Sequence, residues 1–158
     1  MIITRKEFFV KSAQGMAIMS LPVLFSSFLE SCNQQTTSPN GSSSPLPTIQ
    51  GTISNGTVTV NITSSSAIAK VGSAGIILYS SGSFLVDHPS ATVYNAFTTV
   101  CPHQGCAIDS FDSGNNQFVC LCHGSHFDIN GKVVQGPASS ALQQYQTQFT
   151  NNQLIITL

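Results

Sequence analysis

Two short segments of the chain combine cysteine and histidine at spacings that suit a metal centre. Residues 101–106 are Cys-Pro-His-Gln-Gly-Cys, and residues 120–125 are Cys-Leu-Cys-His-Gly-Ser. Each segment offers one Cys and one His to a shared centre and leaves a second Cys over. Two thiolates and two imidazoles suit an iron–sulfur cluster in which one iron has sulfur ligands and the other has nitrogen ligands. Because such a cluster moves one electron at a time, the two segments indicate an electron carrier.

The cysteines left over are Cys106 and Cys122, one in each segment, and they suit a disulfide that ties the two segments together. A second interpretation is that the two Cys and two His hold a single tetrahedral zinc ion in a structural site. A zinc site would give no role to the remaining cysteine pair or to Ser125, which follows in the second segment. The two interpretations differ in colour, because an iron–sulfur centre absorbs visible light and a zinc ion does not.

The sequence around these segments predicts an all-β domain. Apolar and polar residues alternate along several stretches, and Asn-Gly or Asn-Asn pairs mark hairpin turns at 55–56, 130–131 and 151–152. No helical periodicity of useful length follows residue 48, and 139–145 has room for one turn at most. Many short strands with regular turns imply an antiparallel sandwich or small barrel. Strands are expected at 58–62, 75–80, 83–86, 92–100, 127–129, 132–134 and, as a closing hairpin, 148–158, with a Ser81-Gly82 turn between the second and the third.

The composition excludes some classes of function. A chain of 158 residues is long enough for one domain and rarely for two. Charged residues make up 7% of the chain, whereas 41% of the residues are hydrophobic. After Cys32, two lysines face four aspartates, which gives this part a net charge of −2. That charge is too weak and too acidic for nucleic-acid binding, so no nucleic-acid partner is expected.

Residues 1–32 have the features of a bacterial export signal. A basic segment, 4–11, precedes an apolar stretch from Met16 to Leu29. The stretch is shorter than the about 20 residues that a membrane-spanning helix needs, so it fits the hydrophobic region of a signal peptide better. Arg5-Lys6 followed by Phe8-Phe9 resembles a twin-arginine signal, which exports folded proteins. A general secretory signal is the alternative.

The expected export signal ends at a candidate lipidation site. Leu29-Glu30-Ser31-Cys32 resembles a bacterial lipobox, and Cys32 is the one cysteine that the two segments do not use. An uncleaved N-terminal anchor is the alternative. Residues 33–47 are mostly Gln, Thr, Ser, Pro, Asn and Gly, a composition that predicts a flexible linker. The folded domain is therefore expected over 48–158, which is long enough for a stable core.

Taken together, the two segments resemble the cluster-binding loops of the Rieske iron–sulfur domain in its disulfide-containing form. The shared pattern is Cys-x-His, sixteen residues, then Cys-x-x-His, with an extra Cys in each loop. Gly136-Pro137-Ala138 resembles the proline loop that lies near the cluster in that family. The resemblance covers most of 48–158 and implies a Rieske-like antiparallel β-sandwich or small barrel with a cluster-binding subdomain of two loops. It also implies one [2Fe-2S] cluster, held by the thiolates of Cys101 and Cys120 and the imidazoles of His103 and His123, and a disulfide between Cys106 and Cys122.

The resemblance further implies which residues set the reduction potential of the cluster. Ser125 has the position whose hydroxyl donates to a bridging sulfide in high-potential members, and such donors raise the potential. Phe127 replaces a Tyr that donates to a ligand Cys in those members, although plain core packing also explains a Phe there. Gln104 replaces a Leu that helps to dock the Rieske subunit in quinol-oxidising cytochrome bc complexes. The expected potential is therefore lower than that of quinol-oxidising members.

The export signal and the resemblance together imply a membrane-tethered periplasmic electron carrier or the small subunit of an oxidoreductase. Its redox partner would be a cytochrome or the large subunit of an oxidoreductase. A Rieske subunit of a quinol-oxidising cytochrome bc complex is the alternative. An oxygenase component is less favoured, because the chain is too short for the mononuclear iron domain and Rieske domains of that class normally lack the disulfide.

Four other polar residues have simpler interpretations. His126 is out of phase with the expected ligands and should be an exposed loop residue, and His88, before Pro89, should lie in a turn. Asp109 and Asp112 lie between the two segments and are expected to be solvated. Nothing in the sequence places them as a carboxylate pair for acid–base catalysis.

Overall fold

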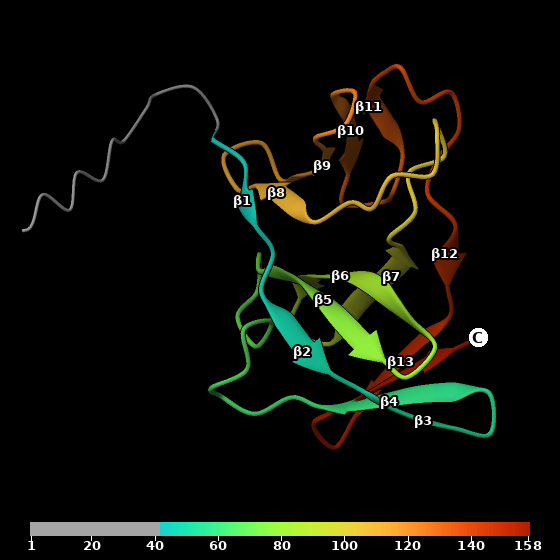
Figure 1. Ribbon diagram of the computed structural model, residues 1–158. Helices are drawn as coiled ribbons and strands as arrows, with labels where there is room; N and C mark the ends of the chain where they lie inside the picture. Colours follow the sequence, from blue (N-terminus) through green and yellow to red (C-terminus); the bar gives the residue numbers. More distant parts are fainter. Residues whose placement is uncertain (1–41) are drawn as a thin grey trace, which may run out of the picture. The chain divides into compact units, whose positions relative to one another are not determined.

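The computed structural model describes residues 42–158, and these residues form strands β1 to β14 and no helix (Figure 1). The prediction of an all-β domain is confirmed. Within this part of the chain there is accordingly no helix long and apolar enough to cross a membrane. The expected export signal, Cys32 and the first residues of the expected linker lie outside the described residues.

A five-stranded sheet forms the middle layer of the domain. It is antiparallel except at one edge, where β2 runs parallel to β5. The long strand β6 pairs with β5 on one side and β7 on the other, and its residues 84–88 are all buried. Successive side chains of a strand point to opposite faces, so both faces of this sheet are covered. In spatial order the strands are β12 (Gln144–Tyr145), β7 (Val93–Thr98), β6 (Gly82–Ser90), β5 (Ala74–Tyr79) and β2 (Thr48–Gln50).

A four-stranded antiparallel sheet covers one face of the middle sheet. Alternate residues of β4 and β14, Val58 and Val60 with Leu154 and Ile156, share one hydrophobic core with Phe84 of β6. The two sheets therefore pack face to face, as in a β-sandwich. In spatial order the strands are β13 (Thr147–Thr150), β14 (Gln153–Thr157), β4 (Thr57–Asn61) and β3 (Thr52–Ser54).

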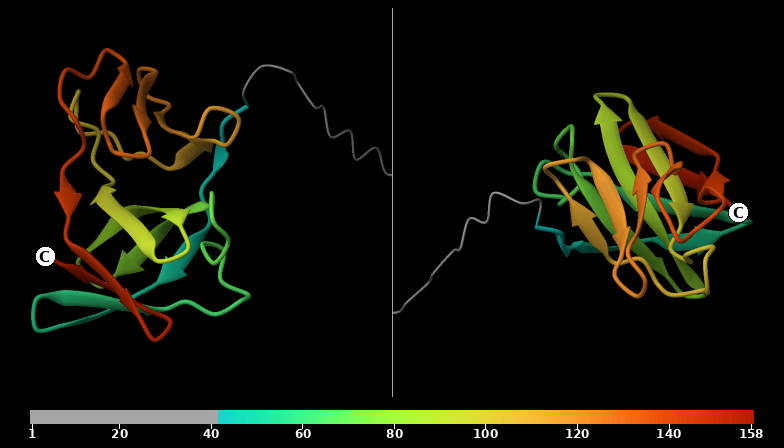
Figure 2. Two further views of the ribbon diagram at one scale, coloured as in Figure 1. Left: turned by 180° about the vertical axis from the view of Figure 1, so that it is seen from behind. Right: turned by 90° about the horizontal axis from the view of Figure 1, so that it is seen from above.

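A third sheet, drawn at the top of Figure 1 and seen from behind and above in Figure 2, carries the two cysteine–histidine segments. Its core contains Phe111, Phe118 and Phe127, together with Leu85 and Phe97 from the middle sheet. The first segment connects β7 to this sheet, and the second is the turn between β9 and β10. In spatial order the strands are β1 (Ser44–Pro45), β8 (Ser110–Asp112), β9 (Gln117–Cys120), β10 (Ser125–Asp128) and β11 (Val133–Gln135).

The predicted hairpins are present, with shifts of one or two residues at two of them. Asn55-Gly56 and Asn151-Asn152 lie at the turns as predicted, and all four residues have positive φ. The turn between β5 and β6 lies at Ser80-Ser81 rather than Ser81-Gly82, because Gly82 already pairs with Tyr79. The turn at Asn130-Gly131 is wider than a two-residue hairpin, because the amide of Asp128 donates to the carbonyl of Lys132 across the loop.

The folded domain begins a few residues before the predicted boundary at Thr48. Ser44 and Pro45 form β1, which pairs with β8. The amide of Leu46 donates to the carbonyl of Asp109 over 2.7 Å, and the Leu46 side chain is buried in the same core as Phe118. The end of the expected linker therefore forms an edge strand of the sheet that carries the metal-centre loops.

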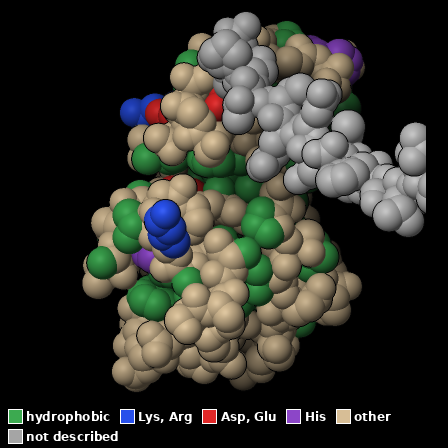
Figure 3. Space-filling model, turned by 90° about the vertical axis from the view of Figure 1, so that its left-hand side faces the viewer, with side chains coloured by type: hydrophobic (Ala, Val, Ile, Leu, Met, Phe, Trp, Pro, Cys, Tyr) green, Lys and Arg blue, Asp and Glu red, His purple; other side chains and the backbone are tan. Residues whose placement is uncertain are grey.

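The surface of the domain is polar but bears few charges. In Figure 3 one face shows mostly uncharged polar and backbone atoms, with a few Lys and Asp side chains. A hollow separates the upper part of that face from the lower part, and hydrophobic side chains lie at its walls. This matches the low share of charged residues in the sequence.

Candidate metal centre

Two loops with the same backbone turn form the site. In the first, the amide of Gly105 donates to the carbonyl of Cys101 over 2.9 Å, and in the second, Gly124 donates to Cys120 over 2.9 Å. Both glycines have a φ of 76°. That backbone conformation is costly for any residue with a Cβ, so glycine at these two positions lets each loop turn directly after its cysteine.

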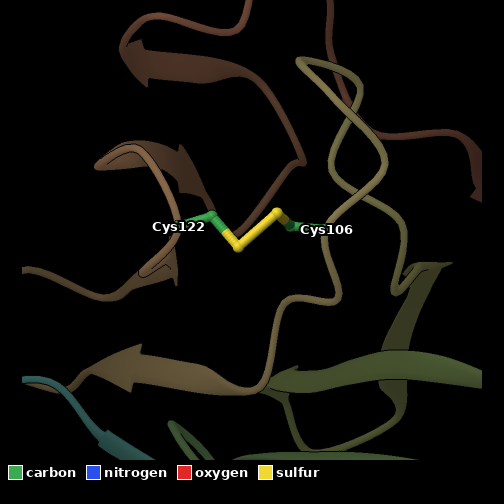
Figure 4. Close-up of a disulfide and its surroundings, with 2 residues drawn as sticks. All are labelled: Cys106 and Cys122. Carbon is green, nitrogen blue, oxygen red and sulfur yellow. A yellow bond between two sulfur atoms is a disulfide. The ribbon is translucent and has the colours of Figure 1, made fainter.

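A disulfide between Cys106 and Cys122 joins the two loops, as the resemblance implied (Figure 4). Cys122 lies in the turn after β9, and Cys106 is the last residue of the first segment, 101–106. The carbonyl of Cys106 also accepts a hydrogen bond from the amide of Cys101 over 2.8 Å. The covalent link and this hydrogen bond together hold the first loop closed and fix it against the second.

Cys101 and Cys120 form a pair of unbridged thiols beneath the loops. Each is 1% exposed, and both belong to the core that contains Phe118 and Phe127. Burial raises the pKa of Cys120, and the adjacent Cys101 raises it further, while hydrogen bonding from the backbone of Cys122 and His123 opposes the shift. The Cys120 thiol therefore resists ionising until a cation binds it, because metal binding displaces a thiol proton.

His103 and His123 form a second pair on the outer side of the site. Their ring centroids are 4.8 Å apart, with the ring planes at 81°. The Nδ1 atom of His103 is buried and has no hydrogen-bond partner, whereas the His123 side chain is exposed. A buried imidazole nitrogen without a donor or acceptor is costly unless a ligand binds it. The Nδ1 atom of His103 is therefore free to bind a ligand.

The four side chains form two pairs, and this arrangement fits a two-iron cluster. A tetrahedral zinc ion needs all four donor atoms around one point, at about 2.0–2.3 Å. No three Cys, His, Asp or Glu side chains within residues 42–158 gather closely enough to surround one ion. A thiol pair on the buried side and an imidazole pair on the outer side instead match an iron with sulfur ligands and an iron with nitrogen ligands.

Ser125 lies at the start of β10 and is fully buried. Its Oγ accepts a hydrogen bond from the amide of Ala138 over 2.9 Å. Within the described residues the Ser125 hydroxyl donates no hydrogen bond, so its proton remains available to a further acceptor. Ala138 belongs to the segment Gly136-Pro137-Ala138, which brings the expected proline loop against the second cysteine–histidine loop.

Phe127 is fully buried two residues further along β10. It lies opposite Phe118 on β9 and belongs to the same core as Cys101 and Cys120. The ring therefore packs as ordinary core, and it brings no hydroxyl to the cysteine pair.

The outer surface of the two loops is uncharged and partly apolar. Gln104 and His123 are exposed, and Leu121 between the two cysteines of the second loop is 63% exposed. Val100 and Val134 are also large exposed hydrophobic residues. The segments 100–107 and 120–127 contain no Lys, Arg, Asp or Glu. Sequence reasoning missed Leu121, although its position between two cysteines of an exposed loop was a usable signal.

Three simpler interpretations from the sequence are wrong. His126 is half-buried on β10, where its Nδ1 lies 2.9 Å from Oε1 of Gln117. Asp112 is 4% exposed and accepts hydrogen bonds from Asn115 and Gly114, and the side chain of Asn115 lowers its pKa most. His88 is 4% exposed and belongs to β6. In each case the contacts of the folded strand or turn decide the burial. Asp109 is exposed, as expected.

Sequence comparison finds relatives of known family. The model of the Rieske [2Fe-2S] domain matches residues 60–146. The cytochrome b6-f complex iron-sulfur subunit of Prochlorococcus marinus (strain AS9601) is 56% identical over 43 residues, which are 27% of this chain and 24% of that protein. The same subunit of Parasynechococcus marenigrum (strain WH8102) is 36% identical over 73 residues, 46% of this chain and 40% of that protein. The chain thus matches less than half the length of these curated relatives.

Structure comparison gives the same architecture. Naphthalene 1,2-dioxygenase with indole bound in its active site superposes with a TM-score of 0.51 at 18% sequence identity. The match covers 63% of this chain and 25% of that chain. At this identity the similarity concerns the fold alone.

Proposed function

Since the chain belongs to the Rieske [2Fe-2S] domain family, we propose that Cys101, Cys120, His103 and His123 are the ligands that make it a one-electron transfer protein. A Rieske domain binds a [2Fe-2S] cluster, which accepts and releases one electron. The two cysteines would hold the inner iron through thiolates, and the two histidines would hold the outer iron through imidazole nitrogens. Two neutral imidazoles in place of two thiolates make the bound centre less negative, which raises its reduction potential to between about −150 and +300 mV.

The observation that carries this proposal is the unpartnered Nδ1 of His103 beside a pair of buried, unbridged thiols. The buried nitrogen is costly in the protein alone, and a bound metal would satisfy it while also using the two thiols as ligands. A pair of buried thiols and a pair of imidazoles are the ligand types of a cluster that moves electrons, so the residues of the site support electron transfer.

The two loops set where electrons enter and leave. Cys101, Cys120 and Ser125 are shielded from water on the inner side, while His123 is exposed on the outer side. Tunnelling partners therefore approach over the histidine edge. The disulfide between Cys106 and Cys122 keeps the loops closed over the buried thiols, so that water does not reach them from the side.

We place the protein on the periplasmic face of a bacterial membrane, held by its N-terminal segment through Cys32 or an uncleaved signal. The export features of residues 1–32 and the disulfide, which needs an oxidising compartment, support this location. Residues 33–43 would serve as the tether, with the domain beginning at β1. The redox partner in this proposal is a cytochrome or the large subunit of an oxidoreductase.

A second candidate function is that of a Rieske subunit in a quinol-oxidising cytochrome bc complex. The curated relatives quoted above are subunits of cytochrome b6-f complexes, and this favours it. Gln104 in place of the Leu at the docking face and Phe127 in place of the Tyr that raises the potential argue against it. A separate carrier or small oxidoreductase subunit therefore remains the preferred proposal.

The midpoint potential of the full-length protein separates the two functions. A potential in the upper part of the Rieske range would favour quinol oxidation, and a markedly lower one would favour a separate carrier. Reduction by added quinol in the presence of a cytochrome c acceptor is the complementary assay. Turnover would support the complex subunit, whereas electron exchange with the cytochrome alone would support the carrier.

A further inference from the structure

A second site of the domain lies in a cavity between the middle sheet and the sheet that carries the metal-centre loops. Its volume is about 150 Å³, similar to that of a cavity that admits a benzene-sized molecule. The walls come from the loop before β5, the end of β6, β8, the turn after β8 and the loop after β10. None of the six residues Cys101, His103, Cys106, Cys120, Cys122 and His123 lines it.

Asp87 lines this cavity and lacks a partner for one carboxyl oxygen. The residue is 3% exposed, and its Oδ1 is buried without a hydrogen-bond partner. Its Oδ2 lies 3.4 Å from Nδ2 of Asn95, which donates a shorter bond of 3.0 Å to the carbonyl of Ile129. The carboxyl is thus only weakly compensated. A buried carboxylate without a cation or a full set of donors is strongly unfavourable.

His88, the next residue, lines the same cavity and offers a second acceptor. Its Nδ1 lies 3.0 Å from the carbonyl oxygen of Ile68. A carbonyl only accepts hydrogen bonds, so Nδ1 carries the proton and Nε2 of the neutral ring has a lone pair. Nε2 is buried and has no partner. The ring stacks on Tyr94 at a centroid distance of 4.0 Å, which holds it in place.

The side chains that line the cavity indicate which class of ligand would satisfy both acceptors. Apolar side chains of Val71, Phe111 and Ile129 form much of the remaining wall. A multivalent metal ion fits poorly, because no third Cys, His, Asp or Glu within residues 42–158 completes a coordination shell. A small organic ligand that is positively charged and bears N–H donors fits the volume, the unpaired carboxylate and the two acceptors together.

We propose that this cavity binds a small organic cation of the amidinium or guanidinium class, with N–H donors directed to the carboxylate of Asp87 and to Nε2 of His88. Its apolar edge would lie against Phe111 and Ile129. The site is separate from the metal centre and does not depend on the redox function. Binding stabilises the folded protein, because the ligand provides the donors and the positive charge that the buried acceptors lack.

Affinity for such a cation falls on acidification. Burial raises the pKa of Asp87 to about 7, and the negative charge of Asp128 on β10 adds to the shift, whereas the hydrogen bond from Asn95 opposes it. The other titratable group at the cavity is His88 on β6, which would repel a cation if protonated. With a pKa of about 7, ionised Asp87 is about 30-fold less populated at pH 5.5 than at pH 8, and the affinity follows that population.

Calorimetric titration of the full-length, cluster-loaded protein with methylguanidinium chloride tests the proposal. At pH 8 we expect saturable one-site binding, weakened about 30-fold at pH 5.5. Tetramethylammonium carries the same charge without N–H donors and is expected not to bind. Asp87→Asn should abolish binding, and Asp109→Asn, the same change at an exposed position, should preserve it. Equal binding of the two cations, no saturable binding, or binding retained in a folded Asp87→Asn variant would each overturn the proposal.

A measurement on the unmodified protein covers the case in which Asp87→Asn fails to fold. In amide NMR spectra, methylguanidinium should shift the signals of Gly72, Ser73 and Asn116, whose residues line the cavity. Shifts confined to other regions would place the cation elsewhere and contradict the proposal. The visible absorption of the cluster should stay constant during the titration, since the cavity contains none of the proposed ligands.

Discussion

We expect the hydrogen bonding of Ser125 to tune the potential of the proposed metal centre. Its hydroxyl accepts from the amide of Ala138 and has no acceptor for its own proton within the described residues. We expect that proton to be donated to a sulfur of the bound cluster. Ser125→Ala should therefore lower the midpoint potential by about 60 mV, which corresponds to about 1.4 kcal/mol for one electron. Potentiometric titration monitored by visible absorption measures the change.

Ser110→Ala is the matched control for Ser125→Ala. Ser110 is also a buried serine of the same sheet, and its hydroxyl is bound to the carboxylate of Asp109. The Ser110→Ala substitution should leave the midpoint potential of the cluster unchanged. Equal potentials for Ser125→Ala and the wild type would show that the free proton of Ser125 does not reach the cluster.

A substitution at Phe127, in the same core, should change the midpoint potential in the opposite direction. The ring is fully buried in the core that also contains Cys101 and Cys120, and it contributes no donor. Phe127→Tyr adds a phenolic hydroxyl, and a hydrogen bond from it to a ligand sulfur should raise the potential by about 60 mV. An unchanged potential in a protein with normal cluster absorption would mean that Phe127 acts by packing alone.

At the residue scale, the sequence was a good guide where local spacing decides the outcome. The pairing of Cys106 with Cys122 followed from a motif within two short loops, and the structure contains that disulfide. The burial of His88 and Asp112 did not follow, because it depends on strands and turns that meet them only in the folded protein. The exposure of Leu121 depends likewise on how the second loop projects from β9 and β10.

The contribution of the disulfide to the stability of the two loops can be measured by removing it. It closes a segment with a sequence separation of 16 residues, and such a loop stabilises the folded state by about 3 kcal/mol in the chain-entropy account. The double change Cys106→Ser and Cys122→Ser should reduce the free energy of unfolding by about that amount and should speed the loss of the cluster. Urea unfolding, followed by far-ultraviolet circular dichroism and by visible absorption, measures both effects.

Comparison with the wild type in dithiothreitol controls for the added serine hydroxyls. If the reduced wild type and the double variant lose the cluster at the same increased rate, the covalent link itself protects the site. A double variant as stable as the oxidised wild type would show that the backbone hydrogen bonds alone, such as that between Cys101 and Cys106, hold the loops.

At the element scale, the hairpins were predictable and the sheet contacts were not. Asn55-Gly56 and Asn151-Asn152 adopt the positive φ values that tight hairpin turns require, and the sequence alone pointed to both. Strand β1 was missed, because two residues of a Ser- and Pro-rich stretch carry no alternation. Its pairing with β8 and the burial of Leu46 come from long-range contacts.

For the whole molecule, the raised pKa of Asp87 predicts how the free energy of unfolding depends on pH. Burial raises its pKa from 3.8 to about 7, so the folded protein keeps this proton over a pH range in which the unfolded chain has lost it. Asp87 makes its full stabilising contribution to the free energy of unfolding below about pH 4. As the pH rises to about 7 this contribution is lost, which lowers the free energy of unfolding by up to about 4 kcal/mol. Asp87→Asn should remove this slope, as measured by urea unfolding at pH 4.5 and pH 7.5.

Asp109→Asn is again the matched control, because Asp109 is exposed. It should retain the wild-type dependence on pH. If Asp87→Asn showed the same decrease in stability between the two pH values as the wild type, the titrating group would be a different one.

The central claim for the whole molecule is that two cysteines and two histidines hold one [2Fe-2S] cluster. Pulsed EPR of the reduced full-length protein tests it most directly, because the spectrum reports the nitrogen atoms bound to the iron. We predict a spin-one-half signal coupled to two histidine nitrogens, with loss of the cluster in His103→Ala and in His123→Ala and an unchanged signal in His126→Ala. A protein without an EPR signal that binds one zinc ion per chain, or a cluster signal without nitrogen coupling, would contradict the account.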